Sequence, residues 1–205
     1  MLNKGNEDPE EIKIILIGDS GVGKTNLINT SVGLEFDLNI NSTITSSCLE
    51  KIIKINRKTY SINLWDTAGQ EIYRGVTKLF FKGSQIAILV YDITKYESFK
   101  SLKEWSNLCN QIIDNDFIYG IVGNKNDLYL QSKVNEEEVK QFAESIKSSF
   151  KIVSAKTDPE RFNYYLIELV KELKNINKND EKNTVKLNNK ENNNNKKKSC
   201  FSCGK

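Results

Sequence analysis

One short loop constrains what this chain can fold into more than any other feature of the sequence. The apolar run Ile12–Ile17 is followed at once by Gly18–Thr25, which has the sequence GDSGVGKT. The loop fits the pattern G-x-x-x-x-G-K-[ST], and we expect a buried strand before it and a helix from about Gly23 onward. Glycines without a Cβ let backbone N–H groups surround phosphate oxygens, and a helix N-terminus favours negative charge. The pattern therefore predicts a phosphate-binding loop.

Two side chains of this loop have expected roles of their own. Lys24 reaches the β- and γ-phosphates of such a ligand, and Thr25 offers its hydroxyl to Mg²⁺. The alternative is a plain glycine turn that opens a helix, and the flanking strand and helix make this the weaker interpretation. The loop alone says nothing about which base the phosphates carry.

The remaining apolar segments predict alternating strands and helices. The expected strands are residues 12–17, 49–55, 60–65, 86–91, 117–122 and 150–153, and helices are expected from about 23 and over 95–114, 136–148 and 162–173. Residues 33–47 and 67–78 lack periodicity and are expected to be exposed loops. This order favours an α/β fold with a six-stranded, mostly parallel sheet flanked by helices on both faces. Ligands of such sheets bind in the loops at the carboxyl ends of the strands.

The composition changes sharply near residue 175. Residues 176–205 hold eight lysines and three acidic residues and almost no apolar ones, so the rest of the chain is slightly acidic although the net charge is +3. Such a segment cannot bury enough apolar surface to offset its ordering entropy. We predict a folded domain over residues 10–175 and a disordered Asn/Lys-rich tail over 176–205. The charge distribution argues against nucleic-acid binding by the domain and favours an anionic partner for the tail.

Several observations favour an intracellular protein. Residues 1–13 are polar and acidic, unlike a secretory signal. The longest apolar run, Ile86–Tyr91, is too short to span a bilayer. Cys48 and Cys109 lie inside periodic segments, where we predict buried free thiols and no disulfide.

The third expected strand ends in a second sequence that suits a phosphate site, WDTAGQE at Trp65–Glu71. Asp66 at the tip of a buried strand can reach Mg²⁺, usually through a water. Gly69 can donate its N–H to a γ-phosphate, and Gln70 can orient an attacking water. A polar transition from strand to loop is the alternative, because D-x-x-G by itself is a weak pattern.

The fifth and sixth expected strands end in residues suited to a base. Asn124–Asp127 has the sequence NKND, and the Asp127 carboxylate can accept from N1–H and the 2-amino group of guanine. Adenine has no donor at either place, so the site would reject it strongly. Backbone N–H groups of Ser154, Ala155 and Lys156 can meet the guanine O6. Four motifs in order, each at the end of a different strand, make chance a poor explanation.

With these motifs the chain resembles the Ras superfamily of small GTPases over residues 10–175, and within it the Rab family. The Rab likeness rests on Leu64–Glu71, on Leu89–Thr94, on the tail cysteines and more loosely on Phe80–Gly83. The resemblance implies a P-loop G domain that binds GTP or GDP with Mg²⁺ and hydrolyses GTP. It also implies a membrane-recruited switch in vesicle trafficking, on the cytosolic face of an intracellular membrane.

The resemblance extends the set of expected site residues. Thr43 would bind Mg²⁺ and the γ-phosphate, and Phe36 would cover the guanine. The expected catalytic residues are Gln70, Lys24 and Thr43, and the expected Mg²⁺ ligands are Thr25, Thr43 and Asp66. The expected nucleotide-binding residues are Gly18, Ser20, Gly21, Val22, Gly23, Lys24, Thr25, Asn26, Phe36, Thr43, Asp66, Gly69, Asn124, Lys125, Asp127, Ser154, Ala155 and Lys156.

Regulators and effectors are expected to bind residues 36–48 and 66–80, whose order would depend on the γ-phosphate. The first of these segments departs from the Rab pattern. Residues 44–48 read ITSSC where Rabs usually have Ile-Gly-Val-Asp-Phe, so Cys48 replaces a Phe of an aromatic patch that effectors contact. We expect an altered choice of effector with nucleotide binding intact. Because this segment offers no arginine for catalysis, slow hydrolysis accelerated by an activating protein is expected, and an exchange factor is implied as well.

Cys200 and Cys203 follow a run of three lysines in the tail. A zinc site needs four ligands, and the chain has no His and no second close Cys pair. Lipidation explains the pair better than free thiols do, and it would hold the basic tail on an intracellular membrane. The ending is not C-a-a-X, because the fourth residue from the end is Ser202. It is also not one of the tight Cys-Cys or Cys-x-Cys endings of Rabs, because two residues separate Cys200 from Cys203.

Three interpretations remain open at this point. The chain is a GTP-hydrolysing switch, a module that binds guanine nucleotide with little hydrolysis, or an unrelated P-loop ATPase or kinase. Asn124–Asp127 argues against the third interpretation, and Gln70 argues against the second.

Overall fold

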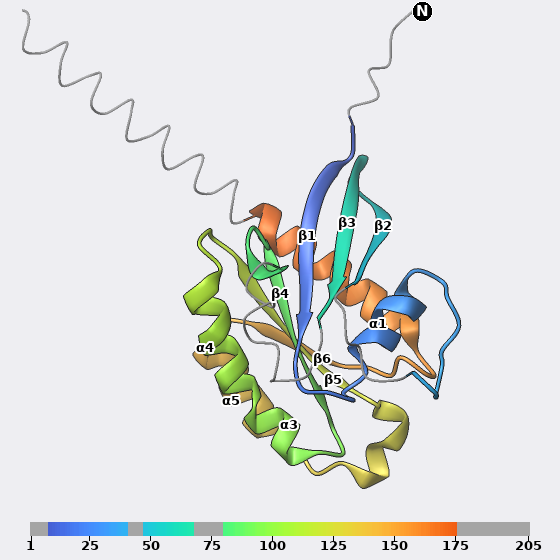
Figure 1. Ribbon diagram of the computed structural model, residues 1–205, viewed down its shortest axis with the longest axis vertical. Coiled ribbons are helices and arrows are strands. Elements are labelled where there is room, and N and C mark those ends of the chain that lie inside the picture. The colour runs from blue at the N-terminus through green and yellow to red at the C-terminus, as the bar shows by residue number, and fades with distance from the viewer. Residues whose placement is uncertain (1–7, 41–46, 68–79, 176–205) are drawn as a thin grey trace, which may run out of the picture. The chain divides into compact units, whose positions relative to one another are not determined.

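The computed structural model describes residues 8–40, 47–67 and 80–175 (Figure 1). The chain divides into two compact units, Met1–Leu169 and Val170–Lys205. Residues 170–175, the described part of the second unit, are helical. The expected loop residues 41–46 and 68–79 and the expected tail 176–205 lie outside the described residues, so the domain limits stay a prediction.

A six-stranded sheet forms the centre of the first unit, with the strand order β2-β3-β1-β4-β5-β6. The strands are β1 Glu10–Ile17, β2 Ser47–Ile55, β3 Lys58–Asp66, β4 Ile86–Asp92, β5 Ile118–Asn124 and β6 Ser149–Ile152. The pair β2–β3 is antiparallel, and the other neighbours are parallel. All residues of β4 are buried, as expected of a central strand in a sheet covered on both faces. The predicted α/β fold with a mostly parallel sheet is confirmed.

A hairpin joins β2 to β3 through a two-residue turn. Asn56 and Arg57 both have positive φ, at 47° and 69°. Two successive left-handed residues match the twist of the flanking strands, which is why such turns favour residues like Asn. The strand β3 begins at Lys58, two residues before the expected start at residue 60.

The helices are α1 Lys24–Ser31, α3 Tyr96–Lys100, α4 Leu102–Ile112 and α5 Glu136–Ser145, the 3₁₀ segment η2 Asn126–Gln131, and residues 159–169 of the first unit. The single helix expected over 95–114 is divided at Ser101, which keeps helical φ and ψ, so the direction of the chain changes little there. The 3₁₀ segment η2 was not predicted, because its sequence NDLYLQ has no helical periodicity.

Helices cover both faces of the sheet (Figure 1). On one face, Tyr119 and Ile121 of β5 pack in a cluster with side chains of α3, α4 and α5. Gly120 points to the opposite face, because side chains alternate along a strand. A Cβ on Gly120 would lie 2.8 Å from Leu169 and 3.2 Å from the Tyr165 hydroxyl, so residues 159–169 pack directly on this face.

The two cysteines within the described residues, Cys48 and Cys109, differ in burial. Cys109 on α4 is buried, as predicted, and its burial raises the pKa of the thiol to about 12. Cys48 is exposed, so the prediction of a buried thiol there is wrong. The reason is its place on β2, an edge strand whose single neighbour in the sheet is β3. Among the described helices, none has the length and apolarity that crossing a bilayer requires.

Candidate functional site

The parallel strands bring the predicted motifs to one edge of the sheet. Since β1, β3, β4 and β5 run in the same direction, their carboxyl ends lie side by side. The loop Gly18–Thr25 leaves β1 at this edge, Asp66 ends β3, and Asn124 ends β5. The predicted motifs therefore meet at the place where open α/β sheets bind ligands.

Two glycines let the loop Gly18–Thr25 lie against its neighbours. Gly18 has φ +150°, and a Cβ there would lie 2.1 Å from the backbone oxygen of Val90 on β4. Gly23 has φ +97°, and a Cβ would lie 2.4 Å from Nδ2 of Asn124. Any larger residue would push the loop away from the sheet, so glycine is required at both positions.

Lys24 points into the curve of this loop. Its side chain is 5% exposed, and Nζ donates to the backbone oxygens of Gly18 at 2.7 Å and Asp19 at 2.9 Å. Burial lowers the pKa of Lys24 to about 8, although the nearby Asp66 and Asp19 carboxylates favour the charged form. A buried ammonium held in this way provides a fixed positive charge for an anionic ligand.

Thr25 and Asp66 bring two oxygen groups together beside Lys24. Thr25 Oγ1 donates to Asp66 Oδ2 at 2.7 Å, and Asp66 is 1% exposed at the end of β3. The next residue, Thr67, donates its hydroxyl to the Leu16 backbone oxygen at 2.6 Å and so fastens the end of β3 to β1. A hydroxyl and a carboxylate are oxygen ligands of the kind that Mg²⁺ prefers, so these residues fit the ion that the motifs imply.

Asn124 joins the phosphate-binding loop to the segment after β6. Its Nδ2 donates to the Val22 backbone oxygen at 2.9 Å, and its Oδ1 accepts from the Ala155 N–H at 3.2 Å. Asn124 therefore holds two loops in place and does not depend on a ligand for its partners. The Ala155 N–H, which was expected to meet a guanine oxygen, is engaged with Asn124 in this structure.

Lys125 makes a second link between the same regions. It has φ +70°, and its Nζ donates to the Gly21 backbone oxygen at 2.8 Å while pairing with Asp92 Oδ2 at 2.7 Å. Burial alone would raise the pKa of Asp92, but hydrogen bonds from Lys125 and Thr94 and the charge of Lys125 lower it below the usual value. Asp92 is 1% exposed at the end of β4, and our sequence prediction did not include it. The available signal was a carboxylate at the tip of a strand, as for Asp66.

Asp127 lies on η2, and Ser154 holds its carboxylate. Ser154 Oγ donates to Asp127 Oδ1 at 2.6 Å and accepts from the N–H groups of Lys156 at 3.2 Å and Thr157 at 3.1 Å. The side chain of Ser154 therefore orients the predicted base-reading carboxylate. The sequence prediction considered only the backbone N–H of this serine.

These loops surround a cavity of about 500 Å³, which lies within the range of small-molecule sites. Its lining comprises Ser20, Gly21, Gly23, Lys24, Thr25, Asn26, Phe36, Asp37, Leu38, Ile40, Asn124, Lys125, Asp127, Leu128, Ala155 and Lys156. Asn26 contributes by pinning the segment that carries Phe36. Its Nδ2 donates to the Asp37 backbone oxygen at 2.8 Å, and its Oδ1 accepts from the Asp37 N–H at 3.1 Å.

Some predicted site residues do not line this cavity. Gly18, Val22, Asp66 and Ser154 border the lining residues and contact them, as described above, without lining the cavity themselves. The predicted residues outside the described part of the chain are Thr43, Gly69, Gln70, Cys200 and Cys203.

Comparison with known proteins agrees with this geometry. The model of the Ras family matches residues 13–175. The chain is 40% identical to human Ras-related protein Rab-22A over 146 residues, which is 71% of this chain and 75% of that protein. It is 43% identical to Rab-11C of Dictyostelium discoideum over 143 residues, 70% of this chain and 64% of that protein. It is 40% identical to Rab-2B of the same organism over 145 residues, 71% and 72% of the two chains.

Proposed function

The chain belongs to the Ras family and is a Rab-like small GTPase, and from this premise we propose that its cavity binds GTP and GDP together with Mg²⁺. Small GTPases hydrolyse GTP, and we propose that this site converts it to GDP and phosphate. The observation that carries the proposal is the single cavity of about 500 Å³ that Lys24 and Asp127 both line. One end offers a buried positive charge for phosphates, and the other offers an oriented carboxylate for a base.

The proposed nucleotide lies with its phosphates in the curve of Gly18–Thr25. Lys24 neutralises negative charge on the phosphates, and the N-terminus of α1 adds a favourable dipole. At the other end, Asp127 accepts from the guanine N–H donors while Phe36 covers the ring. Lys125 and Asn124 connect the two ends through Gly21 and Val22, so base recognition and phosphate binding share one rigid frame.

Thr25 and Asp66 would hold Mg²⁺, with Thr43 as a further ligand. When bound, the ion neutralises charge on the β- and γ-phosphate oxygens. The protein's own contribution is the contact between Thr25 Oγ1 and Asp66 Oδ2, which keeps both oxygens at the mouth of the loop. Asp66 is buried, so it keeps its position without the ion.

For hydrolysis we propose that Gln70 orients the attacking water and that Lys24 stabilises charge on the γ-phosphate. Gly69 and Thr43 would contact the γ-phosphate, so loss of that group would release both loops. The alternative function is a guanine-nucleotide-binding module with little hydrolysis, which the unusual segment around Cys48 favours.

We also propose a role in vesicle trafficking on the cytosolic face of an intracellular membrane. The similarity to Rab proteins supports it, together with the basic tail and its two cysteines. Lipidated Cys200 and Cys203 would anchor the chain, while an exchange factor, an activating protein and effectors would bind residues 36–48 and 66–80. A variant with serine at both cysteines that stays on membranes would contradict the lipid anchor.

Gln70→Leu should lower single-turnover GTP hydrolysis at least about tenfold while leaving GTP binding in place, because leucine cannot position water. Rates would be measured with GTP and ATP in parallel after loading in Mg²⁺. Gln131→Leu, the same change on the exposed end of η2, is the matched control and should hydrolyse GTP at the wild-type rate. Equal rates for wild type and Gln70→Leu would contradict the proposed role of Gln70. A wild-type chain that binds GTP without measurable hydrolysis would favour the alternative function, and binding of ATP as tight as GTP would contradict the proposal.

GDP affinity should fall as the pH rises above about 8. The pKa of Lys24 is lowered to about 8 without a ligand, and an anionic phosphate favours the protonated form, so binding raises this pKa. At a pH between the pKa of Lys24 in the free protein and its higher pKa in the complex, binding takes up a proton, so the affinity for GDP falls with rising pH. Below the pKa of the free protein, Lys24 is protonated in both states and adds no pH dependence. Calorimetric titration with GDP between about pH 7 and 9, in buffers of different ionisation enthalpy, would detect the proton. The uptake should vanish in Lys24→Met.

A further inference from the structure

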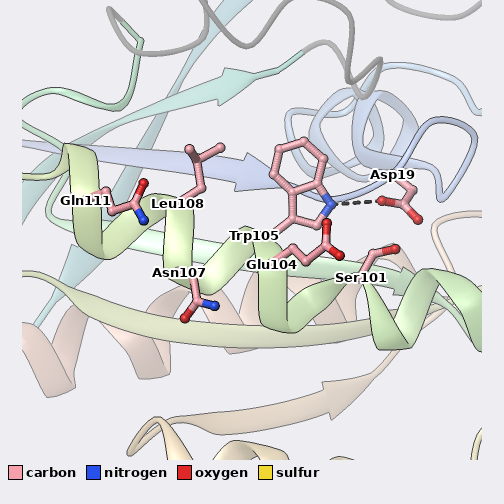
Figure 2. Close-up of a pocket in the computed structure, with 7 residues that line it drawn as sticks. All are labelled: Asp19, Ser101, Glu104, Trp105, Asn107, Leu108 and Gln111. Carbon is pink, nitrogen blue, oxygen red and sulfur yellow. Dashed lines mark hydrogen bonds between the residues drawn. The ribbon is translucent and has the colours of Figure 1, made fainter.

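A tryptophan on α4 contacts the phosphate-binding loop across 86 residues of sequence. Trp105 Nε1 donates to Asp19 Oδ1 at 2.8 Å, as Figure 2 shows. Asp19 is the second residue of the loop Gly18–Thr25. No motif in the sequence pairs these two residues, and the nucleotide site as described above does not use Trp105.

The same aspartate holds the phosphate-binding lysine. While its side chain accepts from Trp105, its backbone oxygen accepts from Lys24 Nζ at 2.9 Å. A change in the position of Asp19 therefore moves one of the two backbone oxygens that orient the Lys24 ammonium. The hydrogen bonds connect α4 to Lys24 through a single residue.

The helix that carries Trp105, α4, is held in place by packing against the sheet. Trp105 is 9% exposed and packs in the cluster that covers one face of the sheet. Leu102 and Cys109, one turn before and one turn after it, are fully buried on α4. A side chain fixed in this way can hold a loop at a small cost in entropy, because its rotamer is already ordered by packing.

The contact with Trp105 differs from the other supports of the loop. Lys125 and Asn124 bind backbone oxygens, at Gly21 and Val22, which any residue would supply. Trp105 binds the side chain of Asp19, so this support depends on the identity of that residue. It can be removed or restored by substitution while the backbone contacts stay in place.

A cavity of about 270 Å³ opens beside this contact, between Asp19 and the residues of α4 that include Glu104, Leu108 and Gln111 (Figure 2). The hydrogen bond therefore lies at the border of a space that water can enter. Water can replace part of a lost hydrogen bond at such a border, so we expect its removal to have a moderate effect.

We propose that Trp105 and Asp19 are positioning residues that slow the release of bound nucleotide by holding Lys24 in place. The proposal rests on the proposed function, because it assigns to α4 a control over the same nucleotide site. Loss of the contact leaves the Lys24 ammonium less ordered, and binding to a less preorganised site is weaker. The expected result is faster dissociation of GDP.

Three single variants of Asp19 and Trp105, and two double variants, test this proposal through the release of a fluorescent GDP analogue. Asp19→Asn and Asp19→Ala remove the same charge, but the asparagine amide oxygen still accepts from the indole. Asp19→Ala should release the analogue about three- to tenfold faster than Asp19→Asn. Trp105→Phe, which keeps a buried ring and lacks the N–H, should release it faster than wild type by a similar factor. In the Trp105→Phe background, Asp19→Asn and Asp19→Ala should release it at the same rate.

Gln111→Ala is the control, since it changes another residue of the same cavity and should keep the wild-type release rate. Melting temperatures of all variants separate the proposal from a purely structural role. If Trp105→Phe melts lower but releases the analogue like wild type, or if alanine and asparagine at position 19 behave alike, the contact has no positioning role. If the wild-type chain retains no guanine nucleotide, the proposed function itself is wrong.

Discussion

Replacing Asp127 by asparagine should reverse the base preference of the site from guanine to xanthine. Ser154 Oγ donates to Asp127 Oδ1 at 2.6 Å, and it can donate equally to the amide oxygen of asparagine. The amide nitrogen then takes the place of the second carboxylate oxygen. Guanine would direct its 2-amino group at this new donor, whereas xanthine offers a carbonyl oxygen at the same position. The serine therefore determines which way the asparagine points.

The expected change in base preference is large, because the asparagine amide and the guanine 2-amino group would both be donors and each would be left without an acceptor. We expect Asp127→Asn to lose about a hundredfold or more in GDP affinity and to bind XDP more tightly than GDP. Competition of GDP and XDP against a fluorescent nucleotide measures both affinities. Asp158→Asn makes the same chemical change at the start of the helical residues 159–169, where Asp158 Oδ1 accepts from the Arg161 N–H, and it should keep the guanine preference. An Asp127→Asn variant that still prefers GDP would show that this residue does not read the base.

The motifs could be placed correctly from the sequence for a physical reason. Apolar runs separated by helical segments require parallel strands, and parallel strands bring their carboxyl ends to one edge. Asp66 is the last residue of β3, and the segments that carry Lys24 and Asp127 leave the ends of β1 and β5, so their meeting point follows from local patterns. The structure brings these three residues to one edge of the sheet, and two of them line one cavity.

The contacts that hold the site together could not be predicted in this way. The pairs Trp105–Asp19 and Asp92–Lys125 join segments far apart in the chain, and no local pattern identifies them. Periodicity also shows which side chains share a face of a strand, but not whether anything covers that face. Cys48 was therefore misassigned, because the position of its strand at the edge depends on the whole sheet.

Family motifs predict that a residue matters without saying what it touches. Asn124 was expected to bind nucleotide, and the structure shows it bonded to Val22 and Ala155 of the protein. Its part in the site is to keep the two loops at a fixed separation, a role that depends on partners before and after it in the chain. Only the three-dimensional arrangement shows this role, which the motif alone does not give.

Gly18→Ala should cost this chain more than any other addition of one methyl group to the loop. The new Cβ would lie 2.1 Å from the Val90 backbone oxygen, well inside contact distance. Val90 cannot move away, because it is fully buried and paired with Val122 in the middle of the sheet. The φ of +150° adds strain for any residue with a Cβ. We expect about 3 kcal/mol or more of lost stability, together with loss of nucleotide binding as the loop leaves β4.

Gly33→Ala is the control that separates the two costs of Gly18→Ala, the steric clash with Val90 and the strain of a positive φ. Gly33 has φ +89°, and among the described residues no atom lies within 4 Å of a Cβ built there. Alanine at this position therefore meets the backbone cost alone, about 1 kcal/mol. Urea unfolding of both variants, with nucleotide binding measured in parallel, gives the comparison. Equal losses would mean that Gly18 is needed only for its backbone angles, whereas the larger loss at Gly18 would show that the close contact between the loop and β4 shapes the phosphate site.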